Sequence, residues 1–201
     1  AYMQCEKQQK DKLNTLHANY WKESELPLVE QFFLDLLNGS IFSSQTEIAD
    51  EIRSRHLDST LIQQPFLSLL IQTGPFYSIT SSGNKSLYEF ALKNIVREYF
   101  FQEYELPVTI RVLDSFYLLL LPASGHPHQE VVDRCQNALS DFVTHFPFSI
   151  NFFISSDVHL PEDLHRTFLS MENYAQKNVT YENHVFDLAL ENTSQTSFSS
   201  H

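Results

Sequence analysis

Apolar positions recur along this chain at two different spacings, and each change of spacing marks the boundary of an expected element. Short, nearly unbroken apolar runs are typical of buried strands, whereas apolar residues that return every three or four positions indicate amphipathic helices. Strands are expected at residues 66–71, 108–112, 116–121 and 148–154, and helices at 85–102, 128–144 and 160–176.

The order of these elements predicts an α+β fold. Strand, helix, strand, strand, helix, strand and helix follow one another from Pro65 onward, and only residues 113–115 separate the second and third strands. Such a short connection predicts a hairpin between those two strands. We therefore expect a mainly antiparallel sheet with helices packed on one face.

Two shorter helices are expected before the sheet. Pro27 suits the first turn of a helix, because its missing N–H group has no partner there, and Asn38-Gly39 closes that helix. Ser44 and Glu47 form a capping-box pattern that predicts a second helix over residues 45–55. The apolar face of the first helix is expected to contain Leu28, Phe32, Phe33, Leu36 and Leu37.

The first 26 residues are polar and contain good helix formers, without Gly or Pro. Leu13, Leu16 and Tyr20 are spaced three and four apart and form a narrow apolar stripe. A narrow stripe suits a two-helix seam, which makes these residues candidates for dimerisation. A frayed, solvated helix explains the same pattern, and both interpretations remain open.

These observations divide the chain into four parts. We expect a helical, possibly coiled-coil linker over 1–26, a small helical subdomain over 27–60 and an α+β domain over 61–190. The polar, Ser- and Thr-rich residues 191–201 are expected to be a disordered tail or a linker to another domain.

Composition excludes several classes of function. The formal net charge of −12 disfavours direct contact with the nucleic-acid backbone, and only 4 glycines leave little material for phosphate-binding loops. The two cysteines, Cys5 and Cys135, are far apart and indicate no disulfide framework, which fits a reducing cytoplasm. No signal peptide and no apolar run of about 18 residues is found, so we expect a cytoplasmic segment without membrane contact.

No catalytic, cofactor or metal site is expected. The densest histidine pair, His126 and His128, and the group of Asp157, His159 and His165 lack converging partners, so surface histidines are favoured over metal ligands. Cys135 lies on an apolar helix face, which indicates burial and not nucleophilic chemistry. The aromatic residues Tyr99, Phe100, Phe101 and Tyr104 could stack on nucleobases or line an effector pocket, although core packing is favoured.

Three strings carry a family resemblance: LYEFALKNIVRE at residues 87–98, RVLDSFYLLLLP at 111–122 and LVEQFFLDLLNG at 28–39. They are similar to a helix, a hairpin with its strand, and a preceding short helix of the degenerate GGDEF-like domain in the middle of YesN-type AraC-family regulators. The resemblance implies a GGDEF-like, nucleotide-cyclase-like sheet with packed helices. In that family the domain lies between an N-terminal sensor and a C-terminal pair of helix-turn-helix motifs.

The chain departs from the pattern of active cyclases. An active domain needs carboxylates that hold Mg²⁺ and a Gly-Gly turn that lets the backbone approach the nucleotide. Here residues 113–117 read LDSFY in place of GGDEF, and the end of the first strand, residues 71–74, reads IQTG without a metal-binding Asp. Arg111 and Asp114 match the spacing of a cyclase inhibitory site but overlap the turn, so no cyclic dinucleotide is expected to bind.

The resemblance and these losses together imply a non-catalytic regulatory domain. We expect a homodimer that relays a signal to a DNA-binding domain outside this chain. The alternative is a small-molecule effector-sensing domain, in which the former nucleotide cleft has been reshaped around an effector.

Overall fold

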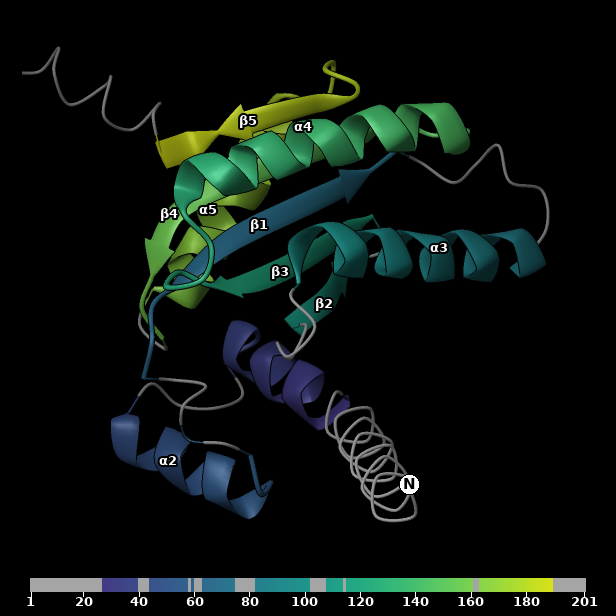
Figure 1. Cartoon of the computed structure of the whole chain (residues 1–201). Coiled ribbons are helices and arrows are strands. Elements are labelled where there is room, and N and C mark those ends of the chain that lie inside the picture. The colour runs from purple at the N-terminus through teal and green to yellow at the C-terminus, as the bar shows by residue number, and fades with distance from the viewer. Residues whose placement is uncertain are drawn as a thin grey trace, which may run out of the picture.

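A five-stranded sheet with strand order β2-β3-β1-β4-β5 lies at the centre of the protein (Figure 1). The structure, a computed structural model, describes residues 27–39, 44–57, 59, 63–74, 82–101, 108–113, 115–160 and 163–189. The strands are β1 (Phe66–Thr73), β2 (Val108–Leu113), β3 (Phe116–Pro122), β4 (Ile150–Val158) and β5 (His184–Asp187). All neighbouring strands are antiparallel except β4 and β5, which are parallel.

Helices connect and cover these strands. A helix over residues 27–37 comes first and is followed by α2 (Gln45–Ser54), α3 (Ser82–Phe100), α4 (His128–His145) and α5 (Leu164–Lys177). From β1 to β4 the chain runs β1-α3-β2-β3-α4-β4, which is the split βαβ arrangement of ferredoxin-like folds. The predicted α+β class and the predicted β2–β3 hairpin are confirmed.

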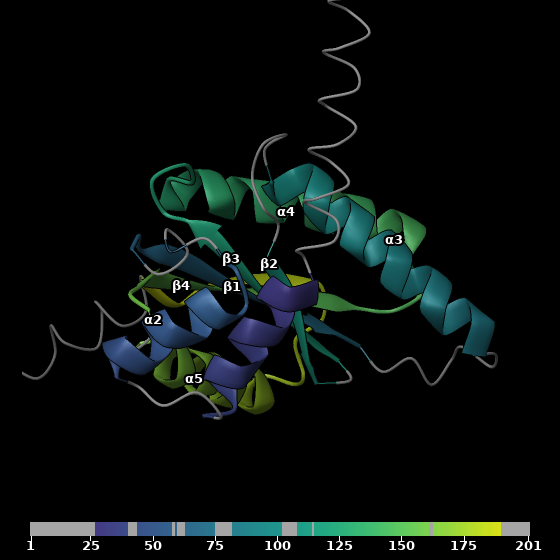
Figure 2. The ribbon, with the colours of Figure 1, turned by 90° about the horizontal axis from the view of Figure 1, so that it is seen from below.

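Helices cover both faces of the sheet, so the prediction that they pack on one face was wrong (Figure 2). We call the side with α3 and α4 the α3–α4 face, and the side with α5, α2 and the helix over 27–37 the α5 face. In β1, Leu67 and Leu69 point to the α3–α4 face, whereas Phe66 and Leu70 point to the α5 face. Strands that are apolar without alternation need cover on both sides, and this signal was already present in the sequence.

The helix over 27–37 is part of the core of the α5 face. Val29, Phe32 and Phe33 are at most 1% exposed and belong to the same cluster as Phe66 of β1 and Val108 of β2. Leu28, which was expected on this buried face, is 47% exposed, because Val29 takes the corresponding place beside Phe32 and Phe33. Gly39 ends the helix with a left-handed φ of +68°, a conformation that glycine adopts without strain.

The helix that the capping-box pattern predicts is confirmed as α2, with Ser44 as its N-cap. The hydroxyl oxygen of Ser44 accepts a hydrogen bond from the amide of Glu47 at 3.3 Å, and Ile48 and Ile52 are buried in the cluster of the α5 face. Packing on this face is therefore continuous between the helices over 27–60 and the sheet. The proposed division of the chain at residue 61 remains a prediction.

Strand β5 was not predicted. It contains only four residues, and one of its edges pairs with β4. Phe186 holds it against the α5 face by stacking on Phe153 with ring centroids 4.9 Å apart. Four residues with polar ends leave little periodic signal, so tertiary contacts define this strand.

Candidate functional site

The end of β1 and the β2–β3 turn lie side by side at one end of the sheet. The amide of Thr73 donates to the carbonyl of Ser115 at 2.8 Å, and the Thr73 hydroxyl donates to the same oxygen at 3.4 Å. Gln72 pairs with Phe116, the first residue of β3. The two segments whose sequences depart from the cyclase pattern are therefore neighbours, and we call this region the hairpin end of the sheet.

Neutral side chains make internal hydrogen bonds at the hairpin end. Asn151, which is 5% exposed, donates to Gln72 Oε1 at 3.2 Å and to the carbonyl of Tyr181 at 2.9 Å. Its Oδ1 accepts from the amide of His184 at 3.0 Å. The buried amide thus ties β1, β4 and β5 together, and its donors and acceptor are already used by the protein itself.

Gly74 brings the end of β1 close to the start of β4. Its amide donates to the carbonyl of Ser149 at 2.7 Å, and a Cβ atom at this position would lie 2.6 Å from Ser149 Oγ. Any larger residue would therefore collide with Ser149. The close approach joins the two strands directly.

The carboxylate of Glu89 on α3 faces β2 near the hairpin end. One of its oxygens lies 3.2 Å from Arg111 Nη1, so an arginine balances its charge. Within the part of the chain that the structure describes, no group of three His, Cys, Asp or Glu side chains converges as a metal site would require. Asp114 lies outside the described residues. The described groups at this end are amides, hydroxyls and one paired carboxylate, which suit structural hydrogen bonding.

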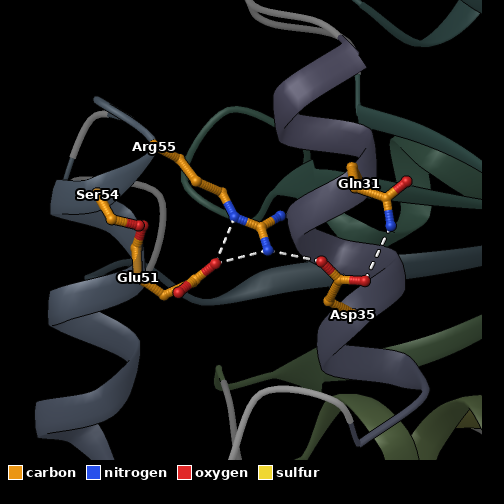
Figure 3. Close-up of polar contacts among 5 residues, drawn as sticks. All are labelled: Gln31, Asp35, Glu51, Ser54 and Arg55. Carbon is orange, nitrogen blue, oxygen red and sulfur yellow. Dashed lines mark hydrogen bonds and ion pairs between the residues drawn. The ribbon is translucent and has the colours of Figure 1, made fainter.

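A second polar cluster joins the helix over 27–37 to α2 (Figure 3). Arg55 Nη2 lies 2.6 Å from Asp35 Oδ2, and Arg55 Nε donates to Glu51 Oε1 at 2.7 Å. The guanidinium also lies 6.0 Å from the centre of the Phe32 ring. We call Asp35, Glu51 and Arg55 the Arg55 clamp.

The Arg55 clamp is partly shielded from solvent and connects two helices. The side chains of Arg55 and Asp35 are each 20% exposed, so solvent screens the pair only in part. Burial lowers the pKa of Arg55, but the hydrogen bonds and charges of Asp35 and Glu51 outweigh it, and the net pKa is raised. Gln31 donates to the second oxygen of Asp35 at 2.8 Å, which further fixes that carboxylate. The clamp therefore connects the two helices through Asp35 and Arg55, which are 20 residues apart in the sequence.

A third contact connects the helix over 27–37 to the opposite face of the sheet. Glu30 Oε1 lies 3.8 Å from Lys93 Nζ on α3, at the edge formed by β2. Burial raises the pKa of Glu30, and the charge of Lys93 partly offsets that rise. The first turn of this helix thus reaches past the edge strand to α3.

The histidine predictions were partly wrong. His126, expected at the surface, is 2% exposed, because the loop between β3 and α4 folds it inward. Nε2 of His128 lies 2.9 Å from both carboxylate oxygens of Asp187 on β5. His165 bonds to the carbonyl of Leu37 through Nδ1 at 2.8 Å, and His159 and Asp157 are exposed.

Burial of Cys135 is confirmed, and desolvation raises the pKa of its thiol well above the ordinary value. Core packing of Phe100 is also confirmed, and Tyr99 and Phe101 pack against the same cluster. Tyr99 donates to Asp141 on α4, which raises the pKa of the phenol. Tyr104 lies outside the described residues, as do the dimerisation candidates Leu13, Leu16 and Tyr20.

Sequence reasoning missed the Arg55 clamp and the pair of His128 with Asp187. The spacing of Glu51 and Arg55, four apart on one helix, was a readable signal. The contact with Asp35 depends on how two helices pack, and the pair of His128 with Asp187 depends on an unpredicted strand.

A solved structure resembles this chain, although no sequence comparison assigns the chain to a family. No protein-family model matches the chain, and no curated protein matches its sequence. Among solved structures, the active GGEEF domain of a diguanylate cyclase from Vibrio cholerae is similar with a TM-score of 0.48 and 11% sequence identity. The similarity covers 64% of this chain and 86% of that domain. At this identity the likeness concerns the fold alone. None of the described helices is long and apolar enough to cross a membrane.

Proposed function

We propose that this chain is a non-catalytic, GGDEF-like regulatory domain that receives a signal through its N-terminal segment and passes it on by a change in helix pairing. The observation that carries the proposal is the packing of the helix over 27–37. This helix follows residues 1–26 directly, and Val29, Phe32 and Phe33 anchor it in the core of the sheet. A displacement of the preceding segment would therefore act on a helix that is anchored in the core of the folded domain.

Two polar contacts strengthen this coupling. The Arg55 clamp ties the helix over 27–37 to α2, and the pair of Glu30 with Lys93 ties its first turn to α3. Signal relay requires two states with different contacts, and a helix pair that changes its packing is one such element. Through these two contacts, a movement at the N-terminal helix would be felt on both faces of the sheet.

The hairpin end supports a role without catalysis. The sequence of its turn lacks the glycines and paired acids of active cyclases, and its described side chains are neutral or paired with an arginine. Magnesium-dependent turnover of GTP by the purified protein would contradict this part of the proposal.

The finer proposal concerns the protein to which this domain belongs. Its resemblance to YesN-type AraC-family regulators leads us to propose a cytoplasmic homodimer that contacts DNA only through a helix-turn-helix domain outside these 201 residues. Reading the gene on both sides of this segment tests the idea. A downstream pair of helix-turn-helix motifs would support it, and a reading frame without any would contradict it.

Light scattering of the full chain over a wide concentration range tests the relay. We expect a dimer, and we expect the double substitution Leu13→Asp and Leu16→Asp to dissociate it, because the two charges would lie in the apolar seam. Val179→Asp is the matched control, since Val179 is 66% exposed and far from the seam in sequence.

The possible outcomes separate the relay from the alternative. A dimer that survives the double substitution would contradict dimerisation through the apolar seam. A monomer at every concentration would favour the effector-sensing domain, for which thermal-shift screening against small molecules is the direct assay. The internal hydrogen bonds of Asn151 and Gln72 at the hairpin end argue against a ligand there, which is why the relay is placed first.

A further inference from the structure

Helix α3 exposes two large apolar side chains on its outer surface. Leu87 is 63% exposed and Phe90 is 65% exposed, whereas Leu92, Val96 and Phe100 of the same helix are at most 1% exposed. Residues three apart on a helix are neighbours, so Leu87 and Phe90 form one continuous patch. Figure 2 shows α3 beside α4 on the same side of the sheet. We call these two residues the α3 patch.

Basic side chains border the α3 patch. Lys93 and Arg97 follow Phe90 at intervals of three and four residues, and both are exposed. The chain as a whole is acidic, with a formal net charge of −12, whereas Lys93 and Arg97 place two positive charges near these apolar groups. It favours an occupant that is amphipathic and acidic near one end.

The N-terminal segment starts its path close to this patch. Glu30, in the first turn of the helix over 27–37, lies 3.8 Å from Lys93, which is one helical turn from Phe90. Leu26 precedes Pro27, and a residue before proline is disfavoured in the helical conformation, so the chain can change direction there. The six peptide steps from Tyr20 to Leu26 can span up to roughly 20 Å. The patch extends about 9 Å along α3 from Lys93, the residue that Glu30 contacts, to Leu87.

The sequence of the segment complements the patch. Leu13, Leu16 and Tyr20 provide an apolar stripe, and the stretch between that stripe and Pro27 contains Glu23, Glu25 and one lysine, Lys22. If the stripe covers Leu87 and Phe90, the connection that contains the two glutamates returns toward Pro27 past Arg97 and past the pair of Lys93 with Glu30.

We propose that the apolar stripe at Leu13, Leu16 and Tyr20 docks onto the α3 patch of its own chain. This inference deepens the proposed relay and rests on it for its meaning. The same stripe then has two alternative partners, the stripe of a second copy and the α3 patch, and a signal that favours one releases the other. The docked form is the monomer present at low concentration, and the paired form is the dimer present at high concentration.

The single tryptophan of the chain, Trp21, is adjacent to Tyr20 and reports on docking. In the full chain, at concentrations where light scattering shows a monomer, we expect Trp21 to be protected from acrylamide quenching. Phe90→Ser and Leu87→Ser should each raise quenching toward that of the urea-unfolded chain. Val143→Ser on α4 is the matched control, because Val143 is 54% exposed and should leave quenching unchanged. Far-UV circular dichroism verifies that each variant is folded.

Three other results would contradict the proposed docking. Trp21 that is fully quenched in the unsubstituted monomer would show an undocked segment. Protection that persists in Phe90→Ser and Leu87→Ser would place the segment elsewhere, and protection that grows with protein concentration would show that a second copy covers it. Because quenching is measured on the monomer and the relay is judged from the dimer, failure of one can be told apart from failure of the other.

Discussion

The two faces of the sheet are built from different parts of the chain. The α3–α4 face is covered by helices that lie between β1 and β4 in sequence. The α5 face is covered by segments from outside the β1–β4 unit. The helix over 27–37 and α2 precede that unit in the sequence, and α5 follows it. The first face thus closes the β1–β4 unit on itself, whereas the second joins that unit to the segments that precede and follow it.

This difference assigns separate roles to the two layers. Burial on the α3–α4 face stabilises the sheet, and its polar contacts, such as that of Tyr99 with Asp141, connect α3 to α4. The α5 face carries the Arg55 clamp and the anchored helix over 27–37, so in the proposed relay it is the layer that receives the input. The clearest tests of the relay therefore compare matched changes on the two faces.

The largest expected effect comes from truncating one buried phenylalanine on each face. Phe33→Ala and Phe142→Ala should each cost about 3–5 kcal/mol in the free energy of unfolding, because each removes a side chain that is at most 1% exposed. Denaturation with urea measures both. Hydrogen exchange should separate them, with Phe33→Ala exposing amides of residues 27–37 first and Phe142→Ala exposing those of α4. Identical exchange patterns would contradict the division between the faces.

A smaller effect is expected from breaking the Arg55 clamp. Arg55→Met leaves Asp35 and Glu51 partly buried without their cation, and we expect a loss of about 1–3 kcal/mol in unfolding free energy. Arg53→Met is the control, because Arg53 pairs with Asp50 on an exposed surface and should cost less than about 0.5 kcal/mol. Equal losses in the two variants would show that the clamp adds nothing beyond a surface pair.

The smallest effect is expected at the contact between the N-terminal helix and α3. Burial raises the pKa of Glu30, so its charged form opposes folding, and this penalty disappears as the pH falls below 4.5, the ordinary value for the carboxyl. Glu30→Gln should therefore stabilise the protein slightly at pH 7, with a gain that shrinks to zero in acid. Urea midpoints of both proteins across this pH range measure it. A constant difference at every pH would contradict the burial of this carboxylate.

Much of the fold was predictable because apolar spacing is a local signal. The hairpin at residues 113–115, the cap at Ser44 and the burial of Cys135 and Phe100 were all predicted from neighbouring residues. The helices on the second face were not predicted, because unbroken apolar runs show that a strand is buried on both sides but not which helices cover each side.

The polar contacts were less predictable than the core. Arg55 reaches Asp35 only because two helices pack at a particular angle, and His128 reaches Asp187 only because β5 adds a strand beside β4. The site chemistry at the hairpin end could be predicted in its losses, since missing glycines and acids are visible in sequence. The hydrogen bond between Asn151 and Gln72 at this end depends on the register of β1 with β4.

Because the α5 face is built from segments that are far apart in the sequence, it can fold only late during synthesis on the ribosome. His165 on α5 bonds to the carbonyl of Leu37, a contact that spans 128 residues of sequence. The helix over 27–37 leaves the ribosome before β4 and α5, and its apolar side chains, including Phe32 and Phe33, have no complete partner surface until those elements have been synthesised. During that interval the nascent chain exposes these aromatic side chains, and a chaperone that recognises apolar segments would bind there.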